Sequence, residues 1–178
     1  KFVGLVDGNY GNSSSTSGAF TMNTTNTNSG GWGSSQMRSK VLGSASSPTS
    51  PTANTLLAAL PSDLRAVMKS CTKYTDNKGG NNTAINVSST TDYLFLLSEY
   101  EVFATHQYCN DAEPNYQAQY DYFKAGNSKV ANKHSATGTA AVWWLRSPNY
   151  NNINNNNYFC EVSSSGSLDY NNANNAYG

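Results

Sequence analysis

The chain has 178 residues, and its 11 basic and 11 acidic side chains give a formal net charge of zero. This length fits one domain with a sizeable core, and an aromatic content of 12% is too high for a disordered chain. The balanced charge disfavours electrostatic binding to nucleic acid, and no apolar run is long enough to insert into a membrane.

The N-terminal quarter alternates short apolar runs with turn-forming residues. We expect short strands at residues 2–6 and 19–22, and a loop at residues 23–31. Apolar residues between Trp32 and Leu42 have helical spacing, with Ser34 or Ser35 available as a cap.

Two short helices should follow, at residues 56–60 and 62–68, with Ser62 as the N-cap of the second. Neither is long enough to stand alone, so we expect both to pack against a sheet. Residues 71–75 alternate like a strand, and residues 76–82 are typical of a flexible connection.

The middle of the chain holds one continuous apolar run, Leu94 to Leu97, which favours a strand buried on both faces. Residues 99–103 should form a short helix or a second strand. The spacing of aromatic residues predicts a helix over 116–123.

The last third is predicted to be β-structure. Residues 138–147 should form a strand with Trp143 and Trp144 on opposite faces. Residues 158–162 and 167–170 should form a hairpin that turns at Gly166. Short antiparallel strands, two helices and long polar loops predict an α+β fold in a single domain, residues 1–178.

Asparagine dominates residues 149–178, but packing residues interrupt the run at Phe159, Cys160, Val162, Gly166 and Leu168. A disordered polar tract would lack such interruptions. We therefore predict a ligand-binding surface carried on a hairpin. Its predicted contact residues are Asn149, Tyr150, Asn151, Asn152, Ile153, Asn154, Asn155, Asn156, Asn157, Asp169, Tyr170, Asn171, Asn172, Asn174, Asn175 and Tyr177.

The residue types that stand among these asparagines are mainly Tyr, Ile, Asp and Ser. Each of the four differs from an Asn codon at one of its first two adenines. This is the pattern that mutation targeted to adenines would leave. Asn, Ser and Tyr also make adaptable binding surfaces, because amides and hydroxyls bond in many directions and Tyr adds rigid area.

Several motifs match a known group of proteins in order along the chain. They are Gly30-Gly31-Trp32-x-Ser34-x-x-Met37-Arg38, Leu60 to Val67, Leu94 to Glu99, and Trp143-Trp144-Leu145-Arg146-Ser147-Pro148 followed by Phe159-Cys160-x-Val162 and Gly166. Together they resemble the variable proteins of diversity-generating retroelements and related bacterial and phage W-W-x-R-S-P domains of unknown function.

The resemblance implies a C-type-lectin-like fold that displays variable residues on a solvent-facing β surface within residues 143–178. The implied function is recognition of a variable protein or glycan ligand on a cell surface, by a phage tail or a bacterial surface protein. Trp143, Trp144, Pro148, Phe159, Cys160, Val162 and Gly166 would form the constant frame. Ser163, Ser165 and Ser167 are uncertain members of the contact set.

The chain departs from this group in two respects, at its C-terminal end and at Leu145, which stands where a more polar residue is expected. Members usually continue beyond the final Asn/Gly with a further strand, whereas this sequence stops at Gly178. The pattern Lys1-Phe2-Val3 is typical of the middle of a strand, so we expect that the natural chain starts further upstream.

Signals for catalysis and metal binding are weak, so we expect no enzyme activity, cofactor or metal. Glu113-Pro114-Asn115 repeats a short calcium-lectin motif, but its companion motif is missing. Arg146 should pair with an acidic residue such as Glu99 or Glu101 rather than bind an anion. Glu161 is expected to be an exposed strand residue rather than a general acid.

Two other functions remain open. One is a non-diversified surface lectin or adhesin of the same fold. The other is an enzyme related to formylglycine-generating enzymes, which would require reactive cysteines among Cys71, Cys109 and Cys160 to converge. The simplest interpretation is that these three cysteines are packed or incidental thiols.

Overall fold

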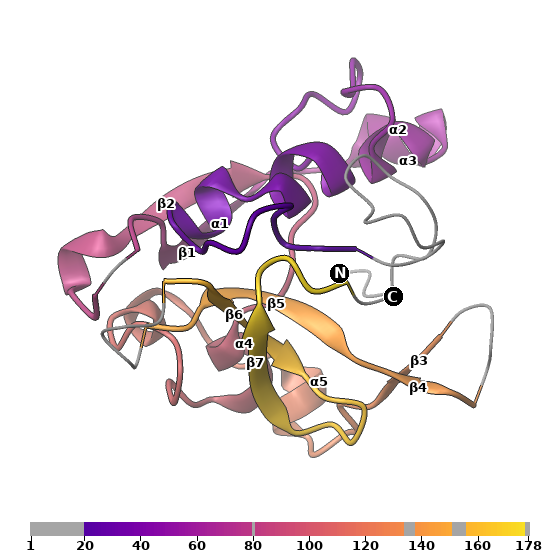
Figure 1. Cartoon of the computed structure of the whole chain (residues 1–178). Coiled ribbons are helices and arrows are strands. Elements are labelled where there is room, and N and C mark those ends of the chain that lie inside the picture. Colours follow the sequence, from indigo (N-terminus) through magenta and orange to yellow (C-terminus); the bar gives the residue numbers. More distant parts are fainter. Residues whose placement is uncertain (1–19, 80, 134–137, 151–155, 177–178) are drawn as a thin grey trace.

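The C-terminal third of the chain forms an antiparallel sheet (Figure 1). A hydrophobic cluster covers each of its faces. A computed structural model of the protein describes residues 20–79, 81–133, 138–150 and 156–176. The sheet has the order β5-β6-β7, with bounds Trp143–Pro148, Tyr158–Val162 and Leu168–Asn172. The register shifts between Trp144 and Pro148, where β5 pairs irregularly with β6.

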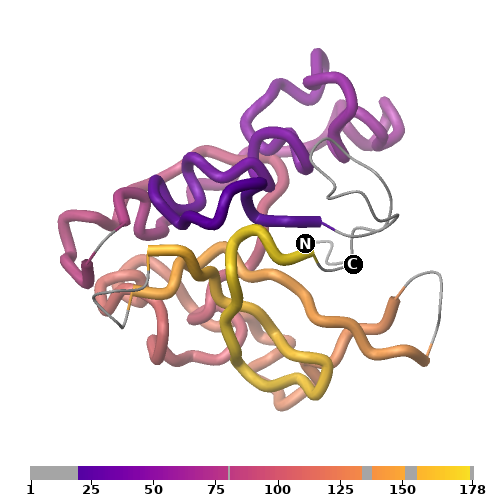
Figure 2. Tube along the Cα trace, in the orientation of Figure 1, coloured from indigo at the N-terminus to yellow at the C-terminus, as the bar shows by residue number. Residues whose placement is uncertain are grey.

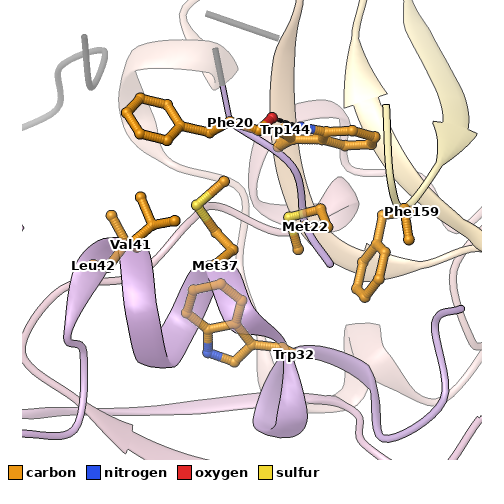
Figure 3. Packing of buried hydrophobic residues seen from close by; sticks show 9 residues of the cluster. Phe20, Met22, Trp32, Met37, Val41, Leu42, Trp144 and Phe159 are labelled. Carbon is orange, nitrogen blue, oxygen red and sulfur yellow. Dashed lines mark hydrogen bonds between the residues drawn. The ribbon is translucent and has the colours of Figure 1, made fainter. Parts of the chain in front are cut away.

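The first cluster lies between this sheet and the N-terminal segments (Figure 3). Trp144 and Phe159 reach it from β5 and β6, and the indole Nε1 of Trp144 donates to the Phe20 carbonyl oxygen at 3.1 Å. The other buried members are Met22, Trp32, Met37, Val41, Leu42 and Ala173. The main-chain N of Asn23 donates to the Ala173 oxygen at 2.8 Å, which joins the two segments that run side by side in Figure 2.

The second cluster covers the opposite face of the sheet. Its buried members are Leu97, Val102, Phe123, Leu145, Cys160 and Val162. Trp143 packs against this cluster, whereas Trp144 belongs to the first one. The prediction that the two tryptophans point to opposite faces is confirmed.

Two short helices supply the second cluster, α4 (Glu99–Phe103) and α5 (Asp121–Lys124). The side chain of Ser98 accepts from the Glu101 N–H and the Glu101 side chain accepts from the Ser98 N–H, which is a capping box. The helical alternative for residues 99–103 is therefore confirmed. The helix expected over 116–123 is wrong in extent, because only its end is α-helical and residues Glu113–Tyr116 form the 3₁₀ turn η3.

The strand expected at Leu94–Leu97 is wrong. This segment has no strand pairing, although its side chains contact both clusters. The Leu97 carbonyl oxygen accepts a single bond from the Arg146 N–H of β5 at 2.8 Å. The apolar run thus reports burial between two clusters, which hydrophobicity alone does not distinguish from a buried strand.

The helix expected between Trp32 and Leu42 is divided in two: α1 (Gly31–Ser34) and the π-helical η1 (Met37–Leu42). Ser35 ends the first, and its hydroxyl accepts from the Arg38 N–H of the second at 3.1 Å, although Gln36 occupies the N-cap position of η1 and no side chain caps it. The strand expected at 19–22 reduces to a bridge at Phe20 among the described residues, and residues 2–6 lie outside them.

The next two helices are α2 (Leu56–Ala59) and α3 (Ser62–Val67). Pro61, not Ser62, occupies the N-cap position of α3, and no side chain caps it. The expectation that both helices pack against a sheet is wrong for α3, which has no buried residue.

Two further hairpins complete the described fold. Strand β1 (Cys71–Asp76) confirms the prediction for 71–75 and pairs with β2 (Val87–Asp92), which follows the 3₁₀ turn η2 (Ala84–Asn86). Strands β3 (Ala131–Asn132) and β4 (Ala140–Ala141) form a small ribbon, so the strand expected over 138–147 is interrupted before β5. The loop after β1 is held by the Asp76 carboxylate, which accepts from the N–H groups of residues 78 and 79.

These elements make the protein an α+β domain with small antiparallel sheets, as predicted. In the part of the chain that the structure describes, no helix has the length and apolar character needed to cross a membrane.

Candidate functional site

The β6–β7 hairpin presents different residues on its two faces. Tyr158 pairs with Asn172 and Cys160 with Tyr170, so these four side chains share one face. Phe159 points to the other face and into the first cluster. Buried residues of β6, the central strand of the sheet, therefore anchor the hairpin. Tyr158 and Tyr170 remain half-exposed.

Tyr108 joins this face from the loop after α4. Its ring lies 4.8 Å from that of Tyr170, and the Tyr158 ring lies 5.3 Å from Tyr170, both in edge-to-face contact. We call Tyr108, Tyr158 and Tyr170 the tyrosine platform. Edge-to-face packing holds each ring in place while leaving part of its surface in contact with solvent.

A buried carboxylate fixes the loop that carries Tyr108. Glu99 Oε2 accepts from the main-chain N of Tyr108 at 3.0 Å and of Cys109 at 2.8 Å. Glu99 Oε1 accepts from the N–H of Gln107 and from the hydroxyl of Thr105. Because hydrogen bonds to a charged acceptor are strong, this side chain determines where the Tyr108 backbone lies.

Asn28 joins both ends of the asparagine-rich loop between β5 and β6. Its side-chain Nδ2 donates to the Tyr158 oxygen at 3.0 Å and to the Asn149 oxygen at 3.4 Å. The main-chain N of Asn28 donates to the main-chain oxygen of Asn156 at 2.8 Å. The main-chain oxygen of Asn28 accepts from the Tyr150 hydroxyl at 3.1 Å. Asn28 is fully buried, so it acts as a clamp beneath the loop.

Two predicted contact residues face the interior instead of solvent. Asn149 and Tyr150 are each 2% exposed. The N–H of Tyr150 donates to the Tyr108 oxygen at 2.8 Å, and burial raises the pKa of the Tyr150 hydroxyl far above its ordinary range. Displaying these side chains on the surface would break the clamp, so the expectation of solvent exposure is wrong for both.

The side chains of the other predicted contact residues that the structure describes are either exposed or intermediate in exposure. Asp169 and Asn174 are exposed, as is Asn156. The remaining ones, all intermediate in exposure, are Asn157, Tyr170, Asn171, Asn172 and Asn175. Asn151, Asn152, Ile153, Asn154, Asn155 and Tyr177 lie outside the described residues.

Asn172 forms a polar rim beside the tyrosine platform. Its Oδ1 accepts from the side-chain amides of Asn26 at 3.1 Å and Asn157 at 3.5 Å. Ala173, the next residue, is completely buried in the first cluster. The asparagine run therefore alternates surface amides with a packing residue.

The serines of the hairpin turn bond mainly to one another. The Ser163 and Ser165 hydroxyls lie 2.9 Å apart, and the Ser167 N–H donates to the Ser163 hydroxyl at 3.1 Å. Gly166 adopts a φ of 84°, which favours glycine, so the predicted turn is confirmed. These contacts give the serines a role in the turn itself.

An ion-pair network lies under the frame. Arg146 Nη1 contacts Glu101 Oε2 at 2.5 Å, and Lys73 Nζ contacts Glu101 Oε1 at 2.7 Å. Burial alone would raise the pKa of Glu101, but the two cations outweigh it and lower the pKa. The prediction that Arg146 pairs with an acidic residue is confirmed. Glu161 was expected to be exposed, but it is 4% exposed, because it pairs with Trp144 on the face of the sheet that the first cluster covers.

Glu113 of the calcium-lectin-like motif is turned into the interior. Its Oε1 accepts from the Asp76 N–H at 3.0 Å and its Oε2 from the Ser147 hydroxyl at 2.8 Å. Complete burial raises its pKa to about 7. This carboxylate ties η3 to β1 and β5 and does not face a surface ligand.

The cysteines are free thiols, and two of them approach the same carboxylate. Cys109 donates its N–H to Glu99, and Cys160 Sγ lies 3.8 Å from Glu99 Oε2. Burial raises the pKa of both thiols well above 9.0, which disfavours the thiolate needed for nucleophilic chemistry. Within the described residues, no group of three or more His, Cys, Asp or Glu side chains could hold a metal ion.

Sequence reasoning missed four residues of this site: Tyr108, Tyr158, Glu99 as the support of Tyr108, and Asn28. Asn28 stands in a chain already rich in asparagine and is 130 positions from Tyr158, so no local pattern separates it from its neighbours. Tyr108 belongs to a loop with no periodic signal.

The comparison with protein families gives a match over most of the chain. The family model described as a domain of unknown function, DUF6273, matches residues 15–178. No curated protein and no solved structure matches the chain.

Proposed function

The chain belongs to the DUF6273 family, whose description names no function, and from its structure we propose that it is a ligand-binding protein. Its binding surface is the tyrosine platform with the surrounding asparagines of the β6–β7 hairpin. We propose further that a retroelement diversifies this surface through adenine mutagenesis on a C-type-lectin-like scaffold. The carrier is a phage tail or a bacterial surface protein, and the ligand lies on another cell surface.

The observation that carries this proposal is that buried packing residues and exposed residues lie close together on one hairpin. Phe159, Cys160 and Val162 are completely buried, whereas Asp169 and Asn174 are exposed a few residues away. Substitutions of exposed side chains change stability by only about 0.5 kcal/mol or less. The ligand contacts can therefore change while the buried residues keep the backbone in place.

The clamp narrows the set of residues that can change. Asn149 and Tyr150 are buried and bonded to Asn28 or the Tyr108 backbone, so we assign them to the constant frame. The changeable positions among the described residues are Asn156, Asn157, Asp169, Tyr170, Asn171, Asn172, Asn174 and Asn175.

The DNA around the gene tests the diversification claim. We expect a reverse-transcriptase gene nearby and a second, near-identical copy of the 3′ coding segment that differs from the gene only at adenines. Variants recovered from related strains should differ at the exposed positions and keep Asn149 and Tyr150. A locus with neither a reverse-transcriptase gene nor the repeat would contradict diversification. The alternative is then a non-diversified adhesin or lectin, for which a glycan array should show reproducible binding to one sugar.

A further inference from the structure

The C-terminal surface has a one-sided charge. Residues 147–178 contain no lysine, arginine or histidine and only two acidic residues, Glu161 and Asp169. Glu161 is buried in β6 and Asp169 is exposed on β7. The charge that this run shows to solvent is therefore negative, although the whole chain is neutral.

The electrostatic surroundings of Tyr108 agree with this sign. In β7 the side chains of Asp169 and Tyr170 leave opposite faces, but Asp169 Oδ1 accepts from the Tyr170 N–H at 2.8 Å, which keeps the carboxylate beside the backbone of the platform residue. Partial burial is the first cause that raises the pKa of the Tyr108 hydroxyl, and the charge of Asp169 is the second. Tyr170, Cys160 and Glu99 add to the same effect. A ligand that carries negative charge would meet repulsion at the platform.

The ring geometry limits what can bind. The Tyr108 and Tyr158 rings both touch Tyr170 edge to face, with interplanar angles of 73° and 65°. Rings in contact leave no slot between them, so a ligand group must lie on the outside of the platform. The faces of aromatic rings carry negative potential and attract cations placed over them.

We infer that the tyrosine platform receives a cationic side chain, lysine or arginine, from a protein partner, with Asp169 as the countercharge. This inference rests on the proposed function and adds the chemistry of the ligand. A guanidinium suits the site well, because it is planar, stacks on aromatic rings and forms hydrogen bonds with a carboxylate. A neutral glycan can donate hydroxyl hydrogen bonds to Asp169, but it lacks the positive charge that the carboxylate and the ring faces both attract.

The test is selection of a random peptide library displayed on phage against the full chain. We expect the selected peptides to be enriched in Arg and Lys and depleted in Asp and Glu relative to the starting library. The chain has no net charge, so its overall charge does not attract basic peptides. Whether the enrichment depends on the platform is decided by the variants. The best synthetic peptide is then measured against four variants in matched pairs.

The first pair tests the ring. Tyr170→Ala should weaken the peptide by roughly tenfold or more, since it removes the ring that both other tyrosines contact. Tyr116→Ala, which removes a ring that is 56% exposed outside the platform, should leave the affinity unchanged. The second pair tests the charge. Asp169→Asn should weaken binding several-fold and reduce its salt dependence, whereas Asp121→Asn on α5 should do neither.

The outcomes separate this inference from the function on which it rests. Selected peptides that lack basic residues but still need Tyr170, or a neutral glycan that binds at the platform, would overturn the inference and leave the binding function intact. Peptides or glycans whose binding ignores both Tyr170 and Asp169 would overturn the inference and the assigned binding surface together.

Discussion

Replacing Glu113 with glutamine should make the protein more stable at neutral and alkaline pH. The carboxyl group is completely buried, and burial raises its pKa from the ordinary 4.5 to about 7. The folded protein therefore holds this proton more tightly than the unfolded chain does. The free energy of unfolding should fall as the pH rises from about 4.5 to about 7, and then level off.

The size of the effect follows from the two pKa values. The difference between 4.5 and about 7, at about 1.4 kcal/mol per pKa unit, corresponds to roughly 3–4 kcal/mol. An amide mimics the protonated acid, because its oxygen can accept from the Asp76 N–H and its nitrogen can donate to the Ser147 hydroxyl oxygen. Glu113→Gln should remove the penalty above pH 7 and change little below pH 5.

Urea unfolding measured between pH 5 and pH 8 checks this prediction. Wild type should lose stability across the range, and the Glu113→Gln variant should have a flatter profile. Asp63→Asn, which neutralises an exposed carboxylate on α3, serves as the control and should follow wild type. Parallel profiles for wild type and Glu113→Gln would refute the reasoning, since they would show that this carboxyl group does not change its proton affinity on folding.

Three further predictions concern the frame. Asn28→Ala should cost about 1–3 kcal/mol of unfolding free energy, because the buried carbonyls of Asn149 and Tyr158 lose their donor. The control Asn26→Ala, at an exposed position, should cost under about 0.5 kcal/mol. Equal costs in urea titrations would contradict the role of Asn28 as a clamp. Glu99→Gln should cost about 2–4 kcal/mol and speed amide hydrogen exchange at residues 107–109, and unchanged exchange would show that another group holds this loop. Phe159→Ala should cost about 3–5 kcal/mol, against about 0.5 kcal/mol or less for Asn174→Ala, as measured by thermal and urea unfolding; similar values would disprove the division between frame and surface.

Local patterns in the sequence were sufficient for several elements. The hairpin that turns at Gly166 was predictable because a run of serines and a glycine separates two alternating segments. Strand β1 also carries its own signal, whereas the pattern at residues 99–103 left a helix and a strand open, and the structure shows helix α4. The ion pair of Arg146 was predictable because a buried charge without a partner is costly.

Other predictions failed where packing overrides the pattern. The apolar run at Leu94–Leu97 looked like a buried strand, but the segment lies between two clusters without a pairing partner. Helix α3 has the composition of a packed helix and yet buries none of its residues. Sequence periodicity describes which side chains avoid water and does not say which element will cover them.

The amino-acid pattern was enough to predict where the Asn- and Tyr-rich run lies and which packing residues interrupt it. Which of the described asparagines and tyrosines face outward follows from the packing of the whole fold. Asn28 reaches Asn149 and Tyr158 from more than a hundred positions away, and Tyr108 joins Tyr170 across the fold. The exposure of a side chain depends on what the rest of the chain places around it, and in a sequence where the same residue type serves as clamp, frame and surface, composition cannot separate these roles.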